Sequence, residues 1–550
     1  MFMAKGFSIS VAPQNIQISS FLGGNYDDFY FQAEAFDFLF DGVLLNRRKL
    51  FQQFAAKDFE ALIHNIYSGQ KEHFFSVFEG EFRGFLFDKK RKKLLVFTNI
   101  TSTQRVFYIF LNNQIFIDTD LKRLTLSLKN SHFNVEPDVE SLYQLLCFTN
   151  LTEGKTPVKQ VKKLLDGYFL EIDFSETSLV EREYFSLAKI PAFSGSKEQA
   201  LERIHEVFSE SVRLEYEKDS ELGKNHLCLL SGGLDSRIAM FYALKNHRKP
   251  DRAFCFSQSK YFDHTISKKI AQEQQINYEF VPLDGGSFLK KIDELTALSE
   301  GMVLYTGAIH VQHAMENLKY QNFGLFHSGQ IGDGVLGGFN SAPFRKKPSD
   351  FKLVVNRKFL PKIKNSLHET LKNYETEELF LIRNIAFNRT IFGAHVFQQK
   401  AYQTSPFMTK DFLETAISLP EKWKYNQNFY LEWLNKYCPE AVKYRWERTL
   451  LKPDARWKTK FGDRFVKRGF KILNEKVLKT PAKSSMYPYQ FYYDSQPEIQ
   501  RYYAEYFQNN IHRLSGFPEL EKDVTELFAQ RDFFSKSQAV NILAIFKLFF

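Results

Sequence analysis

The segment from Leu229 to Arg237, Leu-Leu-Ser-Gly-Gly-Leu-Asp-Ser-Arg, constrains the fold of this 550-residue chain more than any other. An apolar strand passes through a Ser-Gly-Gly turn directly into a helix. Adjacent glycines let the backbone turn tightly and bring its N–H groups close to an anion. The helix N-terminus adds the positive end of a dipole. The segment therefore predicts a parallel α/β sheet with a pyrophosphate-type anion at the carboxyl end of this strand.

Polar side chains of the same turn supply candidate ligand contacts. Ser231 and Ser236 offer hydroxyl donors, whereas Asp235 would repel a phosphate unless a cation such as Mg²⁺ joined the two. No GxxxxGK[ST] phosphate-binding motif occurs in the chain. A bare Ser-Gly-Gly turn is usually only a tight turn with an N-cap aspartate, but the complete string between a strand and a helix favours the binding site.

A second glycine-rich segment, Ser328-Gly-Gln-Ile-Gly-Asp-Gly-Val-Leu-Gly-Gly-Phe339, follows later in the chain. Apolar residues lead into it, and it carries one carboxylate, Asp333. Standing alone, it would be an ordinary glycine-rich turn with an aspartate.

Two domains are expected, residues 1–190 and residues 191–550, in a chain of combined α/β and α+β class. The first contains many short apolar or alternating segments that predict strands, with few helices, which favours a sandwich-like domain. A turn-rich linker then leads to a capping box at Ser196 and Gln199. Beyond it, strands and helices alternate as in a doubly wound parallel sheet, and a mostly helical extension follows residue 350. The expected elements are strands 7–11, 93–98, 105–110, 114–118, 167–174, 226–230, 253–257 and 278–282, and helices 58–68, 139–148, 235–246 and 264–273.

Composition excludes several classes of protein. The chain is 44% apolar and 25% charged, which is ordinary for a globular protein. It has no long apolar run that predicts a membrane span and no signal peptide, so a cytoplasmic location is expected. The four cysteines are widely spaced, which argues against disulfides and zinc.

The net charge of +10 lies partly in patches at 89–93, 345–347 and 452–471. Without a nucleic-acid-binding motif, these patches are expected to be solvated faces rather than a nucleic-acid surface.

Together, the two glycine-rich segments resemble the paired motifs of the asparagine synthetase family, which contains PP-loop ATP pyrophosphatases. Family members carry SGGxDS at the strand–helix turn and a segment like SGEGADELFGGY after it. Looser similarity covers most of the remaining chain, at residues 41–46, 78–88, 98–108, 163–168 and 405–420.

The resemblance implies an enzyme that splits ATP into AMP and pyrophosphate, adenylates a carboxylate and transfers it to an amine. ATP and Mg²⁺ are the implied cofactors. Asp235 and Asp333 are implied as the Mg²⁺ ligands. The residues implied to contact ATP or its pyrophosphate are Leu229, Ser231, Gly232, Gly233, Leu234, Asp235, Ser236, Ser257 and Gly329.

The N-terminal half departs from the family pattern. Glutamine-hydrolysing members expose a cysteine at position 2, but this chain has Phe2 and no cysteine before Cys147. The family's RGPD segment is absent, and its Asn-Gly-Glu is replaced by Asp41-Gly-Val43. The first domain is therefore expected to be a degenerate Ntn-type, glutaminase-like β-sandwich that has lost glutamine hydrolysis.

The C-terminal half departs as well. Gln330 replaces the glutamate of SGEG and cannot act as a base. Arg237 replaces a second serine, and it could either grip an acidic substrate or be a surface helix residue. Lys452 is the best match to the family's charge-stabilising lysine, with Lys458 and Lys460 as rivals. Arg237, Gln330 and Lys452 are thus the candidate catalytic residues.

Three functions are compatible with the sequence. The first is an AMP-forming amide-bond ligase that joins a small-molecule or peptide carboxylate to ammonia or a substrate amine, without glutamine hydrolysis, as the relatives β-lactam synthetase and lasso-peptide cyclase do. The second is a PP-loop enzyme acting on tRNA. The third is an inactive scaffold. The sequence does not specify the acid, the amine or the oligomeric state, for which a homodimer is one option.

Overall fold

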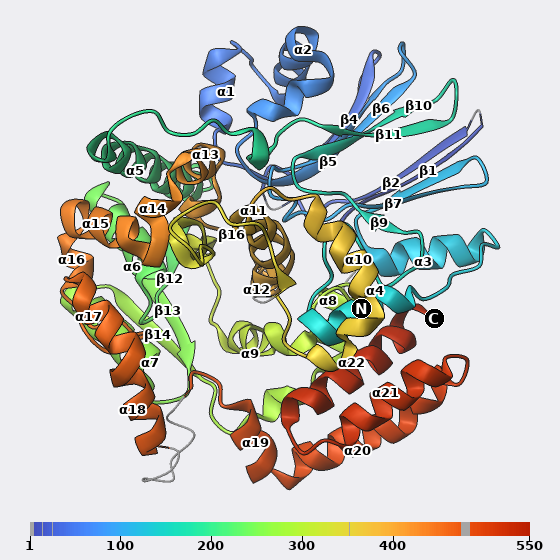
Figure 1. Cartoon of the computed structure of the whole chain (residues 1–550). Helices are drawn as coiled ribbons and strands as arrows, with labels where there is room; N and C mark the ends of the chain where they lie inside the picture. The colour runs from blue at the N-terminus through green and yellow to red at the C-terminus, as the bar shows by residue number, and fades with distance from the viewer. Residues whose placement is uncertain (1–4, 14, 25, 351–352, 475–484) are drawn as a thin grey trace. The chain divides into compact units, whose positions relative to one another are not determined.

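The computed structural model describes residues 5–13, 15–24, 26–350, 353–474 and 485–550 (Figure 1). The chain divides into two compact units. Unit 1 comprises Met1–Gln144, Leu151–Lys189 and Leu548–Phe550, and unit 2 comprises Leu145–Asn150 and Ile190–Lys547.

Unit 1 contains two antiparallel sheets. The first has the order β2-β1-β8-β7-β9 and the second the order β11-β10-β6-β5-β4-β3. A shared apolar cluster, including Phe7 and Ile9 of the first sheet and Phe85 and Val96 of the second, packs the sheets face to face. The strands are β1 (Gly6–Ala12), β2 (Asn15–Phe21), β3 (Phe29–Gln32), β4 (Phe36–Leu44), β5 (Gly80–Asp88), β6 (Lys93–Thr98), β7 (Phe107–Leu111), β8 (Gln114–Asp118), β9 (Lys162–Lys163), β10 (Tyr168–Asp173) and β11 (Ser178–Glu183).

Helices cover the other face of the second sheet. A phenylalanine-rich cluster joins Phe38 and Phe97 of that sheet to Leu62 and Ile66 of α2. Bulky apolar side chains on both faces of the sheet explain why β4 is buried along its whole length. The helices in this part of the chain are α1 (Arg47–Gln53), α2 (Phe59–Gln70), α3 (Leu121–Asn130) and α4 (Val139–Phe148).

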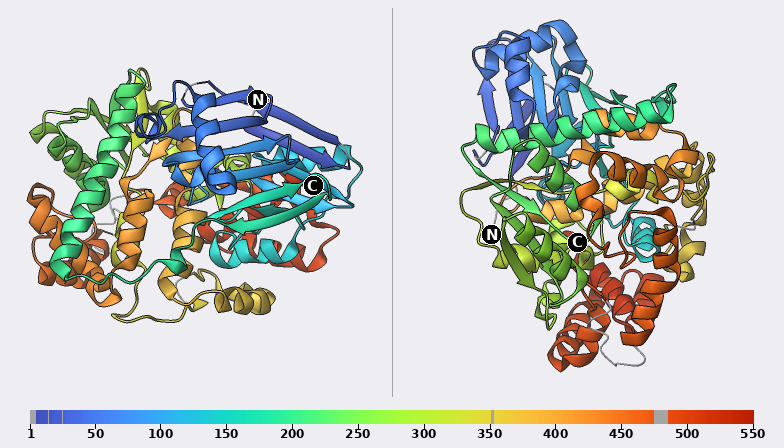
Figure 2. Two further views of the ribbon diagram at one scale, coloured as in Figure 1. Left: turned by 90° about the horizontal axis from the view of Figure 1, so that it is seen from above. Right: turned by 90° about the vertical axis from the view of Figure 1, so that its left-hand side faces the viewer.

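Unit 2 is built on a five-stranded parallel sheet of order β14-β13-β12-β15-β16. The 25-residue helix α5 (Lys197–Glu221), the long green helix in Figure 2, packs on β15. Helix α7 (Phe262–Glu273) packs on β13. The chain leaves β12 toward β13 on one side and returns with β15 on the other. The strand order therefore reverses at β12, and such a switch point is where open α/β sheets bind ligands. The strands are β12 (Asn225–Leu229), β13 (Arg252–Ser257), β14 (Asn277–Pro282), β15 (Phe323–His327) and β16 (Gln403–Thr404).

Helices form most of the rest of unit 2. The terminal helix α22 carries a run of fully buried apolar residues, as expected for a helix that is apolar on all sides. The helices are α6 (Leu234–Lys245), α8 (Ile292–Leu298), α9 (Ile309–Asn317), α10 (Leu360–Lys372), α11 (Glu377–Leu381), α12 (Phe392–Phe397), α13 (Lys410–Ser418), α14 (Glu421–Lys424), α15 (Asn428–Tyr437), α16 (Pro439–Val442), α17 (Arg456–Phe461), α18 (Lys467–Ile472), α19 (Tyr489–Ser495), α20 (Pro497–Asn510), α21 (Pro518–Ala529) and α22 (Phe533–Phe549).

The expected mixed class, with antiparallel sheets followed by a parallel sheet, is confirmed. The capping box is also present, since the Gln199 N–H donates to Ser196 Oγ at 3.2 Å and the Ser196 N–H to Gln199 Oε1 at 2.8 Å. Strand β7 starts at Phe107 rather than at the expected Arg105. The Arg105 carbonyl instead accepts a hydrogen bond from the guanidinium of Arg83 at 2.9 Å. Among the described residues, no helix is both long and apolar enough to cross a membrane.

Candidate active site

The turn between β12 and α6 is held by its own serine side chains. The Ser231 N–H donates to Ser236 Oγ at 3.1 Å, and the Gly233 N–H donates to Ser231 Oγ at 3.1 Å. The two hydroxyl oxygens are 3.0 Å apart. Gly233 is the N-cap of α6, and no side chain caps this helix end. The turn is therefore prefolded, and the N-terminus of α6 is left without the side-chain acceptor that most helices have.

Gly232 is required for close packing. It does not adopt the left-handed backbone region. A Cβ at this position would lie 2.8 Å from Glu447 Cβ, and the Gly232 N–H donates to Asp263 Oδ1 at 2.8 Å. The turn thus depends on the missing side chain at Gly232 rather than on an unusual φ angle, and one of its amides already faces a carboxylate.

Asp235 and Asp333 lie together beyond the ends of β12 and β15. The Asp333 N–H donates to Asp235 Oδ2 at 2.9 Å, and the Tyr430 hydroxyl donates to Asp235 Oδ1 at 2.6 Å. Burial, followed by the charge of Asp333, raises the pKa of Asp235 to about 8. Burial also raises the pKa of Asp333, against the charge of Arg448. Asp235 is half-buried and Asp333 is accessible to solvent, so a divalent cation can reach this pair of like charges and relieve their repulsion.

Gly329 holds the second glycine-rich segment against the first. A Cβ on Gly329 would lie 2.1 Å from the carbonyl carbon of Asp235 and 2.3 Å from the Ser236 nitrogen. The backbone after β15 therefore touches the first turn of α6, and this contact brings Asp333 to Asp235. Gly337 plays a similar part, because its φ of +118° and a contact of 2.1 Å to the Lys424 carbonyl exclude a side chain.

The other residues implied to contact ATP differ in exposure. Leu234 is buried in the core, so only its backbone is available to a ligand. Ser257 is fully buried, and its hydroxyl donates to the Gln258 carbonyl at 2.9 Å. Leu229, at the end of β12, is partly exposed.

Arg237 is a buried residue, which differs from both expectations for it. Its side chain is fully buried, so it is not a surface helix residue. The guanidinium donates to the carbonyls of Gly232 at 2.9 Å, Ala441 at 2.9 Å and Arg445 at 2.8 Å. Burial lowers the pKa of Arg237 to about 10. Arg237 thus ties segment 441–445 to the turn from its buried side, instead of reaching out to a substrate.

Gln330 and Lys452 lie in different surroundings. The Gln330 amide donates to the Thr390 carbonyl at 2.6 Å, and its Oε1 accepts from Gln403 at 3.0 Å. Gln330 is therefore fixed among polar groups beside β16. Lys452 is exposed, and it is not among the groups that shift the pKa of Asp333.

Of the two rival lysines, only Lys458 has a side chain that the structure describes. Lys458 pairs with Asp454 at 2.9 Å on α17, while the side chain of Lys460 lies outside the described residues.

The cation at the carboxylate pair is Arg448, which sequence reasoning missed as a functional residue. Its charge lowers the pKa values of both Asp235 and Asp333. Its guanidinium donates to Gln427 Oε1 at 2.7 Å, and Gln427 Nε2 donates to the Asp333 carbonyl at 3.3 Å. Arg448 lies four residues before Lys452, the lysine that the resemblance implies as the charge-stabilising residue. Tyr430 and Gln427 carried no sequence signal.

A buried ion network anchors the strand that precedes the second glycine-rich segment. His327 Nε2 donates to Asp219 Oδ2 at 2.6 Å, and His327 Nδ1 lies 3.6 Å from Glu215 Oε2. Asp219 also interacts with His226 Nδ1 at 3.0 Å. Although burial alone would lower it, the two carboxylates raise the pKa of His327 to about 9. The network ties the end of β15 to α5, immediately before Ser328.

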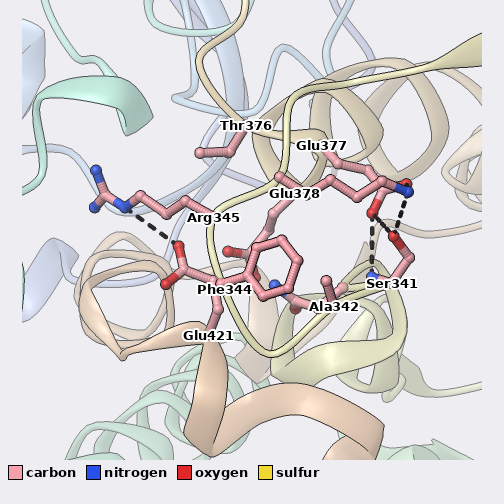
Figure 3. A pocket seen from close by; sticks show the side chains of 10 residues that line it. Ser341, Ala342, Phe344, Arg345, Thr376, Glu377, Glu378 and Glu421 are labelled. Atoms are coloured by element: carbon pink, nitrogen blue, oxygen red, sulfur yellow. Dashed lines mark hydrogen bonds and ion pairs between the residues drawn. The ribbon is translucent and has the colours of Figure 1, made fainter.

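A small pocket follows Gly338 (Figure 3). Glu377 accepts a hydrogen bond from the Ser341 N–H at 3.1 Å, and Arg345 pairs with Glu421 at 3.3 Å. Glu378 is buried and pairs with Lys424, whose carbonyl contacts Gly337. The pocket therefore contains charges of both signs and is connected through Lys424 to the second glycine-rich segment.

Fold and site together define a parallel α/β unit whose carboxylates and uncapped helix end gather at the switch point of the sheet. Residues 203–387 match the model of the asparagine synthase family. The resemblance to the asparagine synthetase family is thereby confirmed for the part of the chain that holds both glycine-rich segments. No curated protein sequence matches the chain.

Solved structures similar to the chain include glutamine phosphoribosylpyrophosphate amidotransferase from B. subtilis, complexed with ADP and GMP, at 8% identity. The match covers 50% of this chain and 59% of that protein, so the chain spans less than two thirds of it. Another is an allosteric regulatory enzyme of purine biosynthesis, at 10% identity, covering 50% of this chain and 74% of that one. Both have a TM-score of 0.22, which is too low to support an inference about this chain.

Proposed function

We propose that this chain is an ATP-dependent, AMP- and pyrophosphate-forming amide-bond ligase. A substrate carboxylate attacks the α-phosphorus of ATP, and pyrophosphate leaves. A substrate amine or ammonia then attacks the activated carbonyl carbon, AMP leaves, and the amine loses a proton. The asparagine synthase match over residues 203–387 supports this class of reaction. The domains proposed for it are residues 1–190 and 191–550.

The carboxylate pair at the switch point is the observation that carries the proposal. Asp235 and Asp333 are joined by a hydrogen bond of 2.9 Å, and burial raises the pKa of each. Oxygen ligands of this kind suit Mg²⁺, and the two residues would hold it. When bound, Mg²⁺ would neutralise charge on the phosphates of ATP.

The chain's own groups account for the remaining parts of phosphate binding. The uncapped N-terminus of α6 and the hydroxyls of Ser231 and Ser236 face the position proposed for the pyrophosphate. Arg448 supplies positive charge beside the carboxylates, and Tyr430 fixes the orientation of Asp235. Gln330 orients neighbouring groups and does not remove a proton, because an amide is not a base near neutral pH.

We also propose that unit 1 has a glutaminase-like sandwich fold without glutamine hydrolysis. Val43 is fully buried in β4, where the family pattern has a glutamate. Asp41 pairs with Arg83 at 2.8 Å, and Arg83 also donates to the Lys5 carbonyl at 2.8 Å. These two positions serve the core and an internal ion pair, which supports a loss of glutamine binding. Incubation with glutamine should release no ammonia, while free ammonia or an amine should support product formation.

The decisive experiment measures pyrophosphate release from ATP and Mg²⁺ in the presence of a panel of carboxylic acids. We expect release that depends on one class of acid and is abolished by Asp235→Ala and by Asp333→Ala. Asp494→Ala, which removes an exposed carboxylate on α19, is the matched control and should be active. No ATP binding by calorimetry in the wild type would contradict the proposal and favour a scaffold. Release dependent on tRNA would favour a tRNA-modifying enzyme.

A further inference from the structure

Helices α17 and α18 are joined by a π-helical turn at Gly462–Val466 (Figure 1). This segment exposes large apolar side chains. The exposed fractions are 67% for Trp457, 50% for Phe461, 56% for Phe465 and 54% for Ile472. Positions 457, 461 and 465 are each four residues apart, so they lie on one side of a helical segment. We call Trp457, Phe461, Phe465 and Ile472 the exposed apolar face.

Other positions fix this segment to unit 2. The ring of Phe470 lies 4.9 Å from that of Phe262 on α7. A Cβ on Gly462 would lie 2.6 Å from Thr449 Cβ, and Thr459 is buried. The segment therefore has an anchored side and a separate apolar side. The contacts that anchor the segment involve Thr459, Gly462 and Phe470, and none of these residues belongs to the exposed apolar face.

The same stretch of sequence is strongly basic. Between Lys452 and Lys471 the chain has eight lysines and arginines and two aspartates. A helical segment that combines exposed aromatic residues with many basic residues is typical of one that lies in the interface of an anionic bilayer. Tryptophan and phenylalanine partition into that interface, and each nearby lysine or arginine adds attraction to anionic headgroups.

We propose that residues 456–473 bind an anionic lipid surface, with the exposed apolar face inserted at the level of the headgroups. Charge complementarity selects this occupant, because eight basic and two acidic residues between Lys452 and Lys471 attract an anionic surface. An uncharged apolar partner would leave this excess of basic charge unused. Ile472 and the neighbouring Leu473, which is 45% exposed, provide aliphatic area that lipid buries but on which nucleic-acid bases do not stack. The inference is independent of the proposed ligase activity.

The test is sedimentation of the full chain with phosphatidylcholine vesicles that contain or lack phosphatidylglycerol. We expect binding to the anionic vesicles, weakening with added salt, and little binding to the neutral ones. The triple variant Trp457→Ser, Phe461→Ser, Phe465→Ser should bind at least about tenfold more weakly. The control variant Phe110→Ser, Leu126→Ser removes side chains of 47% and 50% exposure from unit 1 and should bind like the wild type.

Tryptophan fluorescence gives a second readout that does not require the triple variant to fold. Trp433 and Trp446 are buried, whereas Trp457 is 67% exposed. Anionic vesicles should shift the emission to shorter wavelength in the wild type, and Trp457→Phe should remove most of that shift. Absence of binding to anionic vesicles would overturn the proposal. Equal losses in the triple and control variants would also overturn it, as would salt-dependent binding of RNA without binding of vesicles.

Discussion

The backbone N–H of Asp333 donates a hydrogen bond of 2.9 Å to the carboxylate of Asp235, across 98 residues of sequence. The first turn of α6, which follows β12, makes this contact with the loop that follows the neighbouring parallel strand β15. It places the only carboxylate of the second glycine-rich segment beside the first turn of α6. The pKa of Asp235 rises to about 8 because of burial and of the Asp333 charge, so the pair is poised to accept a cation.

Gly329→Ala tests how closely the two segments must approach. The added methyl group would lie 2.1 Å from backbone atoms of Asp235, which cannot move without shifting α6. We expect a loss of roughly 1–3 kcal/mol in the free energy of unfolding and a loss of ATP binding in the presence of Mg²⁺. Gly516→Ala is the control, since its methyl group would meet open space. Denaturant titration and calorimetry of both variants give the two quantities.

Arg448 should control the affinity for ATP and Mg²⁺ through its charge. It lowers the pKa values of Asp235 and Asp333, and the substitution Arg448→Met removes that effect. We expect at least about a tenfold weaker affinity, corresponding to about 1.4 kcal/mol. The pH at which binding is half-maximal should move upward, because both carboxylates would ionise at higher pH. Arg448→Lys should restore part of the affinity, whereas equal affinity in all three proteins would contradict this role.

Arg237 should matter for stability in a way that lysine cannot replace. Its guanidinium serves three backbone carbonyls at 2.8–2.9 Å, at Gly232, Ala441 and Arg445. Arg237→Met would leave these carbonyls without their donors, and we expect a loss of roughly 3 kcal/mol in the free energy of unfolding. Arg237→Lys should recover little of it, because a single ammonium lacks the planar fork. Arg501→Met, at an exposed position of α20, is the control for denaturant titration.

The buried His327 predicts a pH dependence of stability. Its pKa rises from the ordinary 6.5 to about 9 in the folded chain, so the folded state binds the proton more tightly than the unfolded state. This contribution is fully present below about pH 6.5, declines above it, and is lost as the pH rises through about 9. Stability measured by denaturant titration from pH 6 to about pH 10 should fall more steeply in the wild type than in His327→Gln. Identical slopes would show that His327 does not carry the effect.

Much of the local structure could be predicted from the sequence. Strands β6 and β8 and helix α4 have the bounds expected from their patterns, and the capping box of α5 forms as predicted. The turn between β12 and α6 was expected as well. These features depend on the periodicity of apolar residues and on hydrogen bonds between residues close in sequence, which a short window of sequence contains.

Which residues come together at the candidate site depends on the tertiary structure. The charge of Arg448 acts on the carboxylates, and Arg237 is buried with its guanidinium on backbone carbonyls, because segment 441–448 packs against the turn after β12. The need for glycine at position 329 arises from a contact with Asp235, a residue in the first turn of α6. Each of these relationships joins residues far apart in the chain. Distances, burial and charge between such residues are set by how the elements pack, which local periodicity does not encode.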